Sequence, residues 1–242
     1  MFMMGSGKPL KGGVWTPANL TNGLHWWDTT DAATISDTSG AVTAITDKIG
    51  SCDMTQGTTD KYPITGTRTH NSLNIFDYDG VDDSLANTDD FTMPASGHLF
   101  VVAIVDAVNH AQDSIISAGG SFRLDAANSS LFNGRILSSD SNHGALTNGA
   151  DVIGSMELWE YLWNAGTDEA ELRRNGTSKE IETDYTTDFG IQESLRFGVN
   201  GGDSQFVEMG HGDIIFCDDV VSGGELTSAK TYLADKWNLT VV

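Results

Sequence analysis

Acidic residues crowd one short segment, DYDGVDDS, and are the most direct sign of chemistry in this chain. Three of its aspartates, Asp79, Asp82 and Asp83, are close enough in sequence to offer several oxygens to one cation, and calcium takes such carboxylates together with turn carbonyls. Their spacing is not that of an EF-hand, and aspartates in turns often accept hydrogen bonds from nearby backbone amides instead. Asp28 and Asp31 in WDTTDAA allow the same two interpretations. We expect turn capping and no cofactor, with calcium as the alternative.

Pairs of carboxylates raise the question of glycoside hydrolysis, which needs an acid/base and a second carboxylate flanking one bond. Residues two apart share a strand face, so Glu180, Glu182 and Asp184 in KEIETD meet that spacing. No aromatic residues of the kind expected in a sugar cleft surround this segment. Glu157 and Glu160 are three apart and fall on opposite faces. Because G-x-S-x-G, P-loop and HExxH motifs are also missing from the sequence, we expect no enzyme activity.

Aromatic residues alternate in ELWEYLW, where Trp159, Tyr161 and Trp163 share one strand face. Such a stripe could stack sugar rings on an exposed sheet. A strand that is apolar on both faces is more typical of the inside of a sandwich, however, and this favours core packing. Trp26 and Trp27 are neighbours that point to opposite faces, so one of them can be exposed. These five residues are the candidate carbohydrate-binding set.

The elements that must position these residues read as strands. Short apolar runs alternate with Gly, Asn, Asp and Ser, which predicts an all-β antiparallel sandwich of roughly a dozen strands. Leu99–Val105 has the length of a buried strand, and Asn175-Gly176 favours a type I′ hairpin turn. One helix is expected near residues 222–237, because its apolar residues recur at helical spacing. Ser222 and Glu225 are placed to form a capping box at its start.

The first thirteen residues form a glycine- and lysine-rich arm, and residues 14–242 form one domain. The arm lacks the apolar stretch of a secretory signal and has too little surface to fold alone. We expect it to anchor the domain to a larger assembly through a small set of apolar and basic side chains. That set is Phe2, Met3, Met4, Lys8, Leu10 and Lys11.

Charge excludes several classes of partner. Thirteen basic and 34 acidic residues leave a net charge of −21. Nucleic acid and anionic lipid would both repel so acidic a protein. No apolar run approaches the length of a membrane span. Cys52 and Cys217 are far apart and have no CxxC partner, so we expect free buried thiols.

Several segments, in order, resemble the concanavalin A-like, or laminin G-like, jelly-roll family. Asp47–Ser51 (DKIGS), Phe76–Leu85 (FDYDGVDDSL), His98–Ala107 and Arg173–Ser178 (RRNGTS) are similar to a turn, a hairpin, the central strand and a second hairpin of that family. The segment from Gly210 to Leu239 resembles its closing strand and helix. The resemblance implies a jelly-roll sandwich with one C-terminal helix, but this fold hosts many functions.

The functional expectation combines this resemblance with the acidic body, the arm and the missing catalytic set. It is a non-enzymatic virion structural protein, such as a phage capsid decoration, fibre or tail component. Its partners would be other virion proteins, copies of itself or a host-surface glycan. The first alternative is a free, extracellular, lectin-like carbohydrate-binding module. The second is a polysaccharide-degrading enzyme.

Overall fold

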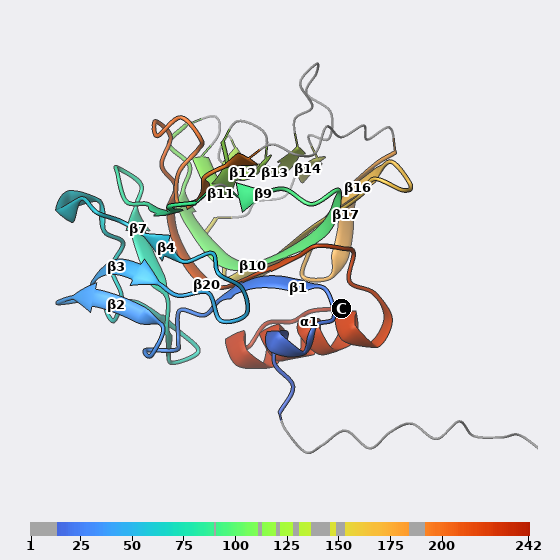
Figure 1. Ribbon diagram of the computed structural model, residues 1–242, viewed down its shortest axis with the longest axis horizontal. Helices are drawn as coiled ribbons and strands as arrows, with labels where there is room; N and C mark the ends of the chain where they lie inside the picture. Colours follow the sequence, from blue (N-terminus) through green and yellow to red (C-terminus); the bar gives the residue numbers. More distant parts are fainter. Residues whose placement is uncertain are drawn as a thin grey trace, which may run out of the picture.

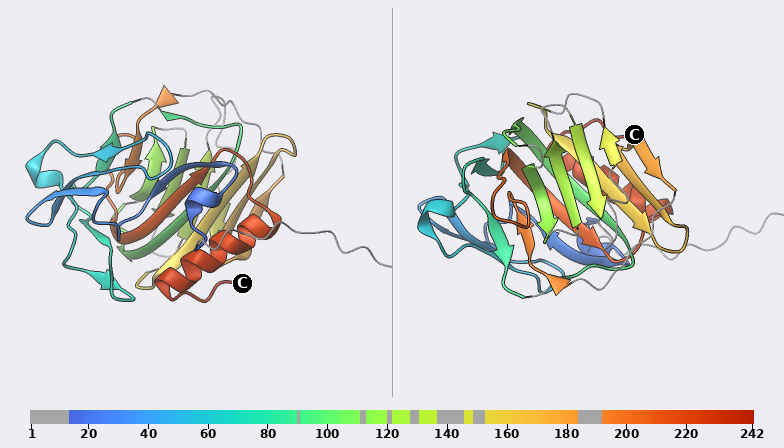
Figure 2. Two further views of the ribbon diagram at one scale, coloured as in Figure 1. Left: turned by 60° about the horizontal axis from the view of Figure 1, so that its bottom comes forward. Right: turned by 90° about the horizontal axis from the view of Figure 1, so that it is seen from above.

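Alternating apolar and polar residues become two antiparallel sheets in the computed structural model. It describes residues 14–242 apart from 90, 111–112, 120–121, 128–130, 137–145, 149–152 and 184–191. The predicted arm of residues 1–13 and the carboxylate predicted at Asp184 therefore lie outside the described residues. Figures 1 and 2 show the sheets as two layers, with one helix on the outer side of the first.

The first sheet has seven strands in the order β1-β20-β10-β15-β16-β17, with β7 also paired to β20. Its longest strand, β10, has the buried apolar run predicted at its centre, and register shifts follow Val101 and Val105 where it pairs with β20. The strands are β1 (Gly23–Trp27), β7 (Phe76–Asp79), β10 (Ser96–Ala107), β15 (Glu157–Asn164), β16 (Glu169–Arg174), β17 (Thr177–Glu182) and β20 (Glu208–Cys217).

The second sheet has nine strands in the order β14-β13-β12-β11-β19-β8-β4-β3-β2. They are β2 (Ile35–Thr38), β3 (Ala41–Ile45), β4 (Met54–Thr55), β8 (Leu85–Asn87), β11 (Asp113–Ala118), β12 (Phe122–Ala127), β13 (Leu131–Ile136), β14 (Leu146–Asn148) and β19 (Leu195–Phe197). Two smaller pairs join β9 (Phe91–Thr92) to β18 (Gln192–Glu193) and β5 (Thr69–His70) to β6 (Leu73–Asn74). Short 3-10 turns span Pro17–Asn19 and Thr59–Lys61.

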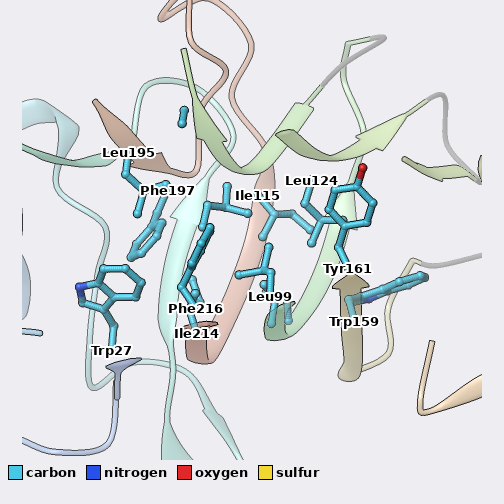
Figure 3. Close-up of a cluster of buried hydrophobic side chains, with 14 of the residues drawn as sticks. Trp27, Leu99, Ile115, Leu124, Trp159, Tyr161, Leu195, Phe197, Ile214 and Phe216 are labelled. Atoms are coloured by element: carbon cyan, nitrogen blue, oxygen red, sulfur yellow. The ribbon is translucent and has the colours of Figure 1, made fainter. Parts of the chain in front are cut away.

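The main core fills the space between the two sheets. Leu99, Ile214 and Phe216 from the first sheet meet Ile115 and Leu124 from the second, all of them fully buried. Figure 3 shows these side chains pointing toward one another across the gap. Burying this apolar surface is the main force that holds the layers together.

Helix α1 (Gly223–Trp237) closes the outer side of the first sheet. Its buried face, Ala229, Leu233 and Trp237, packs in a second apolar cluster with residues of β10 and β20 such as Phe100 and Ile215. The predicted capping box is not formed, because Ser222 makes no side-chain cap bond and Glu225 instead accepts a 2.5 Å hydrogen bond from the Thr21 hydroxyl. The helix and its apolar face were predicted correctly.

A buried carboxylate ties this helix to the sheet. Asp213 Oδ1 accepts a hydrogen bond from Trp26 Nε1 at 2.7 Å, and its Oδ2 accepts one from Trp237 Nε1 at 2.6 Å. Lys236 Nζ lies 2.9 Å from Asp213 and 2.7 Å from Asp28. Trp26 thus serves helix docking on the outer side, whereas Trp27 lies in the core between the sheets.

The sequence predicted the fold class correctly: an all-β antiparallel sandwich with one C-terminal helix. Asn175 and Gly176 have φ values of 50° and 79°, which is the left-handed pair that the predicted hairpin turn requires. The predicted number of strands, roughly a dozen, was too low. The described residues contain twenty strands, several of them two residues long. Within the described part of the chain, no helix is both long and apolar enough to cross a membrane.

Candidate functional site

A cavity of about 500 Å³ opens where β1, an edge strand of the first sheet, lies near β4 and β8 of the second. Its wall combines hydroxyls, carboxylates, one amide and one imidazole with a few apolar side chains. The lining residues are Leu24, His25, Ser51, Cys52, Asp53, Thr55, Asn87, Thr88, Asp89, Phe91 and Thr92. This mixture of hydrogen-bonding groups in a concave site is typical of small-molecule binding.

His25 is held in the cavity wall by a buried carboxylate. Its Nδ1 donates a 2.5 Å hydrogen bond to Asp47 Oδ2, and its ring stacks on Trp27 with centroids 5.4 Å apart. This bond leaves Nε2 as the ring nitrogen available for other contacts. The side chain of Asp47 is fully buried. The imidazole is therefore fixed both in its tautomer and in its plane.

Asp47 is in turn held by the loop that follows β3. Its two oxygens accept hydrogen bonds from the backbone amides of Trp26, Ile49, Gly50 and Cys52 at 3.0 to 3.1 Å. Burial raises the pKa of Asp47, but the hydrogen bonds from His25 and from backbone amides outweigh it and bring the pKa below the ordinary 3.8. Asp47 is thus ionised at neutral pH and organises this side of the cavity.

Gly50 explains why the DKIGS turn contains a glycine. A Cβ at this position would lie 2.4 Å from the Leu24 carbonyl oxygen and 2.5 Å from both Asp47 Oδ2 and His25 Nδ1. The turn wraps so closely around the His25–Asp47 hydrogen bond that no side chain fits there. In the sequence, this turn was identified by its resemblance to a turn of the jelly-roll family, and it was not predicted to belong to a site.

The rim of the cavity carries two exposed aspartates and an amide. Asp53 Oδ1 accepts a 2.9 Å hydrogen bond from the Asp47 amide. Asn87 Oδ1 accepts one from the Leu195 amide at 2.6 Å, and its Nδ2 donates to the Asp89 carbonyl. Phe91, 4% exposed, packs its ring against His25 with centroids 5.7 Å apart. Polar groups rather than an exposed aromatic platform therefore face a ligand.

Cys52 is the potential nucleophile of the cavity, but its chemistry is suppressed. Burial, followed by the negative charge of Asp47, raises the pKa of its thiol to about 12. The thiol is therefore protonated and unreactive at neutral pH. Among the described residues, no hydroxyl or thiol hydrogen-bonds to His25. The arrangement can hold a polar ligand, but it does not assemble a nucleophile with its base.

The five aromatic residues predicted to bind sugar lie in the core instead. Each is at most 4% exposed, so none presents a ring face to a ligand. Trp26 packs beneath α1. The other four lie in the core between the sheets, and they are Trp27, Trp159, Tyr161 and Trp163. The prediction that these residues stack against sugar rings was wrong. Their large apolar surfaces stabilise the sandwich when they are buried, so the rings lie inside it.

The predicted acidic cluster does converge. Ligand atoms of Asp79, Asp82 and Asp83 all lie within 4.8 Å of one another. Two of the carboxylates already cap the turn, since Asp79 Oδ1 accepts the Val81 amide at 2.8 Å and Asp83 Oδ2 accepts the Asp79 amide at 3.0 Å. Burial raises the pKa of Asp83 to about 7, and the neighbouring aspartates add to this effect. Turn capping is confirmed, and calcium at this cluster stays a prediction.

The other carboxylates considered for chemistry are separated from the cavity. Glu180 is exposed on β17, the edge strand at the other end of the first sheet, and Glu182 is half-buried there. Glu157 forms an ion pair with Arg174, and Glu160 lies beside His98 on the outer side of the first sheet. Asp28 and Asp31 both pair with Lys48. Glu157, Asp28 and Asp31 therefore each have a structural ion-pair partner within the fold.

Comparison with known proteins identifies a fold but no family. No family model and no curated protein matches this chain. Trypanosoma rangeli sialidase in complex with 2,3-difluoro-KDN aligns over 99% of this chain and 36% of its own, with 9% identity and a TM-score of 0.61. The same sialidase in complex with sialic acid aligns over 90% and 34%, with 7% identity and a TM-score of 0.60.

A single-site mutant of HCR/D aligns over 88% of this chain and 51% of its own, with 11% identity and a TM-score of 0.64. The chain thus spans about a third of the sialidases and half of HCR/D. At these identities the likeness establishes a β-sandwich fold and no more.

The comparisons also correct the expectation of a virion structural protein. The similar structures include a sialidase in complex with sialic acid, and none of these findings supports a phage structural role. The expectation was wrong because it drew function from a sandwich fold and a terminal arm, and a fold of this kind serves many functions.

Proposed function

We propose that this chain is a non-catalytic carbohydrate-binding module that holds its sugar in the cavity beside His25. The observation that carries the proposal is the cavity itself. It has a volume of about 500 Å³ and a wall of fixed donors and acceptors. That volume lies within the range of roughly 300–1,000 Å³ that is usual for small-molecule sites.

The chemistry of the wall suits a polyhydroxylated ligand. Asp53 and Asp89 accept hydrogen bonds from sugar hydroxyls, and the hydroxyls of Thr88 and Thr92 both donate and accept. His25 Nε2 adds a further polar contact from a ring whose orientation Asp47 has already set. Preorganised groups bind more tightly, because less freedom is lost when the ligand arrives.

The same geometry supports binding without catalysis. The Cys52 thiol is protonated, and no hydroxyl of the described residues is activated by His25. Of the carboxylates first considered for hydrolysis, Glu180 and Glu182 lie on β17, the edge strand at the other end of the first sheet from β1 and this cavity. Under the proposal, a glycan bound here is held unchanged.

The fold is in keeping with this role, and its ordered motifs support placing the chain in the concanavalin A-like, laminin G-like group. Under the proposal its partner is a glycan in an extracellular setting. Nucleic acid is disfavoured by the net charge of −21.

A glycan array followed by isothermal titration calorimetry tests the proposal. Thr88→Trp places an indole on the exposed wall of the cavity and is expected to weaken binding of the strongest array hit at least tenfold. Thr167→Trp is the matched control, since Thr167 is also exposed but lies in the turn between β15 and β16, outside the cavity. It should bind as the wild type does.

Three outcomes would contradict the proposal. The first is a wild-type protein that binds no glycan. The second is an equal loss of affinity in the two variants, which would place the binding surface elsewhere. The third is release of reducing sugar from the bound glycan, which would overturn its non-catalytic character.

A further inference from the structure

The charges around the cavity beside His25 all have one sign. Asp53 and Asp89 are exposed on its rim, and the ionised Asp47 lies directly behind His25. Among the described residues, neither lysine nor arginine lines the cavity. A ligand that enters therefore meets carboxylates without a compensating fixed cation.

The buried thiol of Cys52 reports the field inside the cavity. After burial, the charge of Asp47 is the largest influence that raises its pKa, and Asp53 and Asp89 act in the same direction. The three carboxylates therefore reach the same atom on the cavity wall. The net charge of −21 extends this negative field into solvent.

We infer that the cavity takes neutral or amine-bearing sugars and excludes sugars that carry a carboxylate, such as sialic acid and uronic acids. This inference rests on the proposed function and adds the substrate class. Carboxylates only accept hydrogen bonds, so Asp53 and Asp89 can bind the hydroxyls or amine of a sugar but not another carboxylate. The selectivity would be opposite to that of the similar sialidase, which is known in complex with sialic acid.

The closing experiment measures binding to pairs of related glycans that differ in charge. The probes are lactose against 3′-sialyllactose, and chitotriose against its deacetylated form. They are immobilised together with the strongest neutral hit of the array. We expect at least tenfold weaker binding of 3′-sialyllactose than of lactose, and of the acidic derivative of the array hit than of the hit itself. The deacetylated, cationic trimer should bind at least as well as chitotriose.

Two variants locate the effect. Asp53→Asn together with Asp89→Asn removes both rim charges, while the asparagine at 53 keeps the Oδ1 that accepts the Asp47 amide. We expect this variant to bind the acidic probes at least tenfold more tightly than the wild type does. The matched control is Asp37→Asn together with Asp168→Asn. It makes the same change in net charge at two exposed sites outside the cavity, and Asp37 Oδ1 likewise accepts an amide, that of Gly40.

Salt provides a measurement that needs no variant. If rim charges exclude the acidic probes, the difference between neutral and acidic members should shrink between 20 mM and 500 mM NaCl, because screening weakens exposed charges. A difference that salt does not change would overturn the inference.

The outcomes separate the inference from the proposed function. Equal binding of neutral and acidic probes defeats the inference and leaves the glycan-binding proposal standing. If the control variant gains as much affinity for the acidic probes as the rim variant does, the net charge of the protein rather than the cavity determines this selectivity, and the inference fails. If the wild type binds no glycan, the proposed function fails and the inference fails with it.

Discussion

Two histidines on strands of the first sheet each face a carboxylate, and the two pairs are built in opposite ways. His25 and Asp47 meet at 2.5 Å beside the cavity, and Asp47 accepts four further hydrogen bonds from backbone amides. His98 and Glu160 lie on neighbouring strands on the outer side of the sheet, and both side chains are fully buried. Their closest nitrogen and oxygen are 3.4 Å apart.

The second pair is poorly satisfied. Neither ring nitrogen of His98 and neither carboxylate oxygen of Glu160 has a hydrogen-bond partner in the described structure. His98 stacks on Phe100, with ring centroids 3.9 Å apart, and the charged groups acting on it are Glu160, Glu171 and Arg173. Burial is the main cause that lowers its pKa, while Glu160 opposes this shift.

The contrast separates a polar site that is organised to bind from one that is costly to the fold. Burying a polar group without a hydrogen bond costs free energy, whereas a fully bonded group can be held at little cost. The His25–Asp47 pair therefore suits a preorganised binding wall. The His98–Glu160 pair is expected to lower stability, and the two can be told apart by substitution and by pH.

The largest effect should come from splitting the unsatisfied pair. His98→Leu removes the nearest polar group from the buried Glu160 and leaves it the charge of Arg173, its cross-strand partner on β16, so we expect a loss of about 3–5 kcal/mol in the free energy of unfolding. His98→Leu combined with Glu160→Leu should recover wild-type stability or exceed it, because two apolar residues need no partners. Urea unfolding followed by fluorescence measures both. A double variant less stable than the wild type would show that the pair stabilises the fold.

A smaller loss is expected when the satisfied pair loses its acceptor. Asp47→Ala leaves four backbone amides and His25 without their partner, and we expect about 3 kcal/mol of destabilisation together with loss of glycan binding. Asp37→Ala is the control, because Asp37 accepts a single amide in an exposed turn. It should cost about 1 kcal/mol or less. Similar losses from both would contradict the organising role of Asp47.

Next in size is the effect of adding one methyl group to the turn around the pair. Gly50→Ala forces a Cβ against Leu24, Asp47 and His25, and we expect about 1–3 kcal/mol of destabilisation with weakened glycan binding. Gly57→Ala has open space around its Cβ and should change neither quantity. Thermal unfolding and calorimetric titration of the two variants test this difference. Unchanged glycan binding in Gly50→Ala would show that this turn does not shape the binding site.

The smallest effect is the pH dependence that distinguishes the pairs. The pKa of His98 is lowered in the folded state, so its contribution to stability is present above its unfolded value of 6.5 and is lost as pH falls. The pKa of Asp47 is also lowered, but its contribution is lost only below 3.8.

Between pH 7 and pH 5, the wild type should therefore lose stability relative to the His98→Leu, Glu160→Leu variant, by up to about 1.4 kcal/mol per pH unit. Urea unfolding at pH 7, 6 and 5 measures this difference. Parallel curves for the wild type and the double variant would contradict the buried state of His98.

Local patterns in the sequence determined the elements of this protein. Strand alternation in ELWEYLW, the Asn175-Gly176 turn and the apolar spacing ending at Trp237 each depend on residues close together in the chain. Backbone preference and the period of side-chain directions therefore suffice to place strand, hairpin and helix. The turn-capping role of Asp79 was predictable for the same reason, because its partners are two and three residues away.

Tertiary structure decided which side chains are buried and which form a site. Asp47 meets His25 across 22 residues, and Asp213 joins Trp26 across 187. The cavity combines segments around Leu24, Asp53 and Asn87 that no local pattern connects. The aromatic stripe at Trp159 had a correct face assignment, yet only the opposing sheet decided that the face was closed to a ligand. A sequence period gives the direction of a side chain, whereas the chain packed against it determines whether that direction leads to solvent.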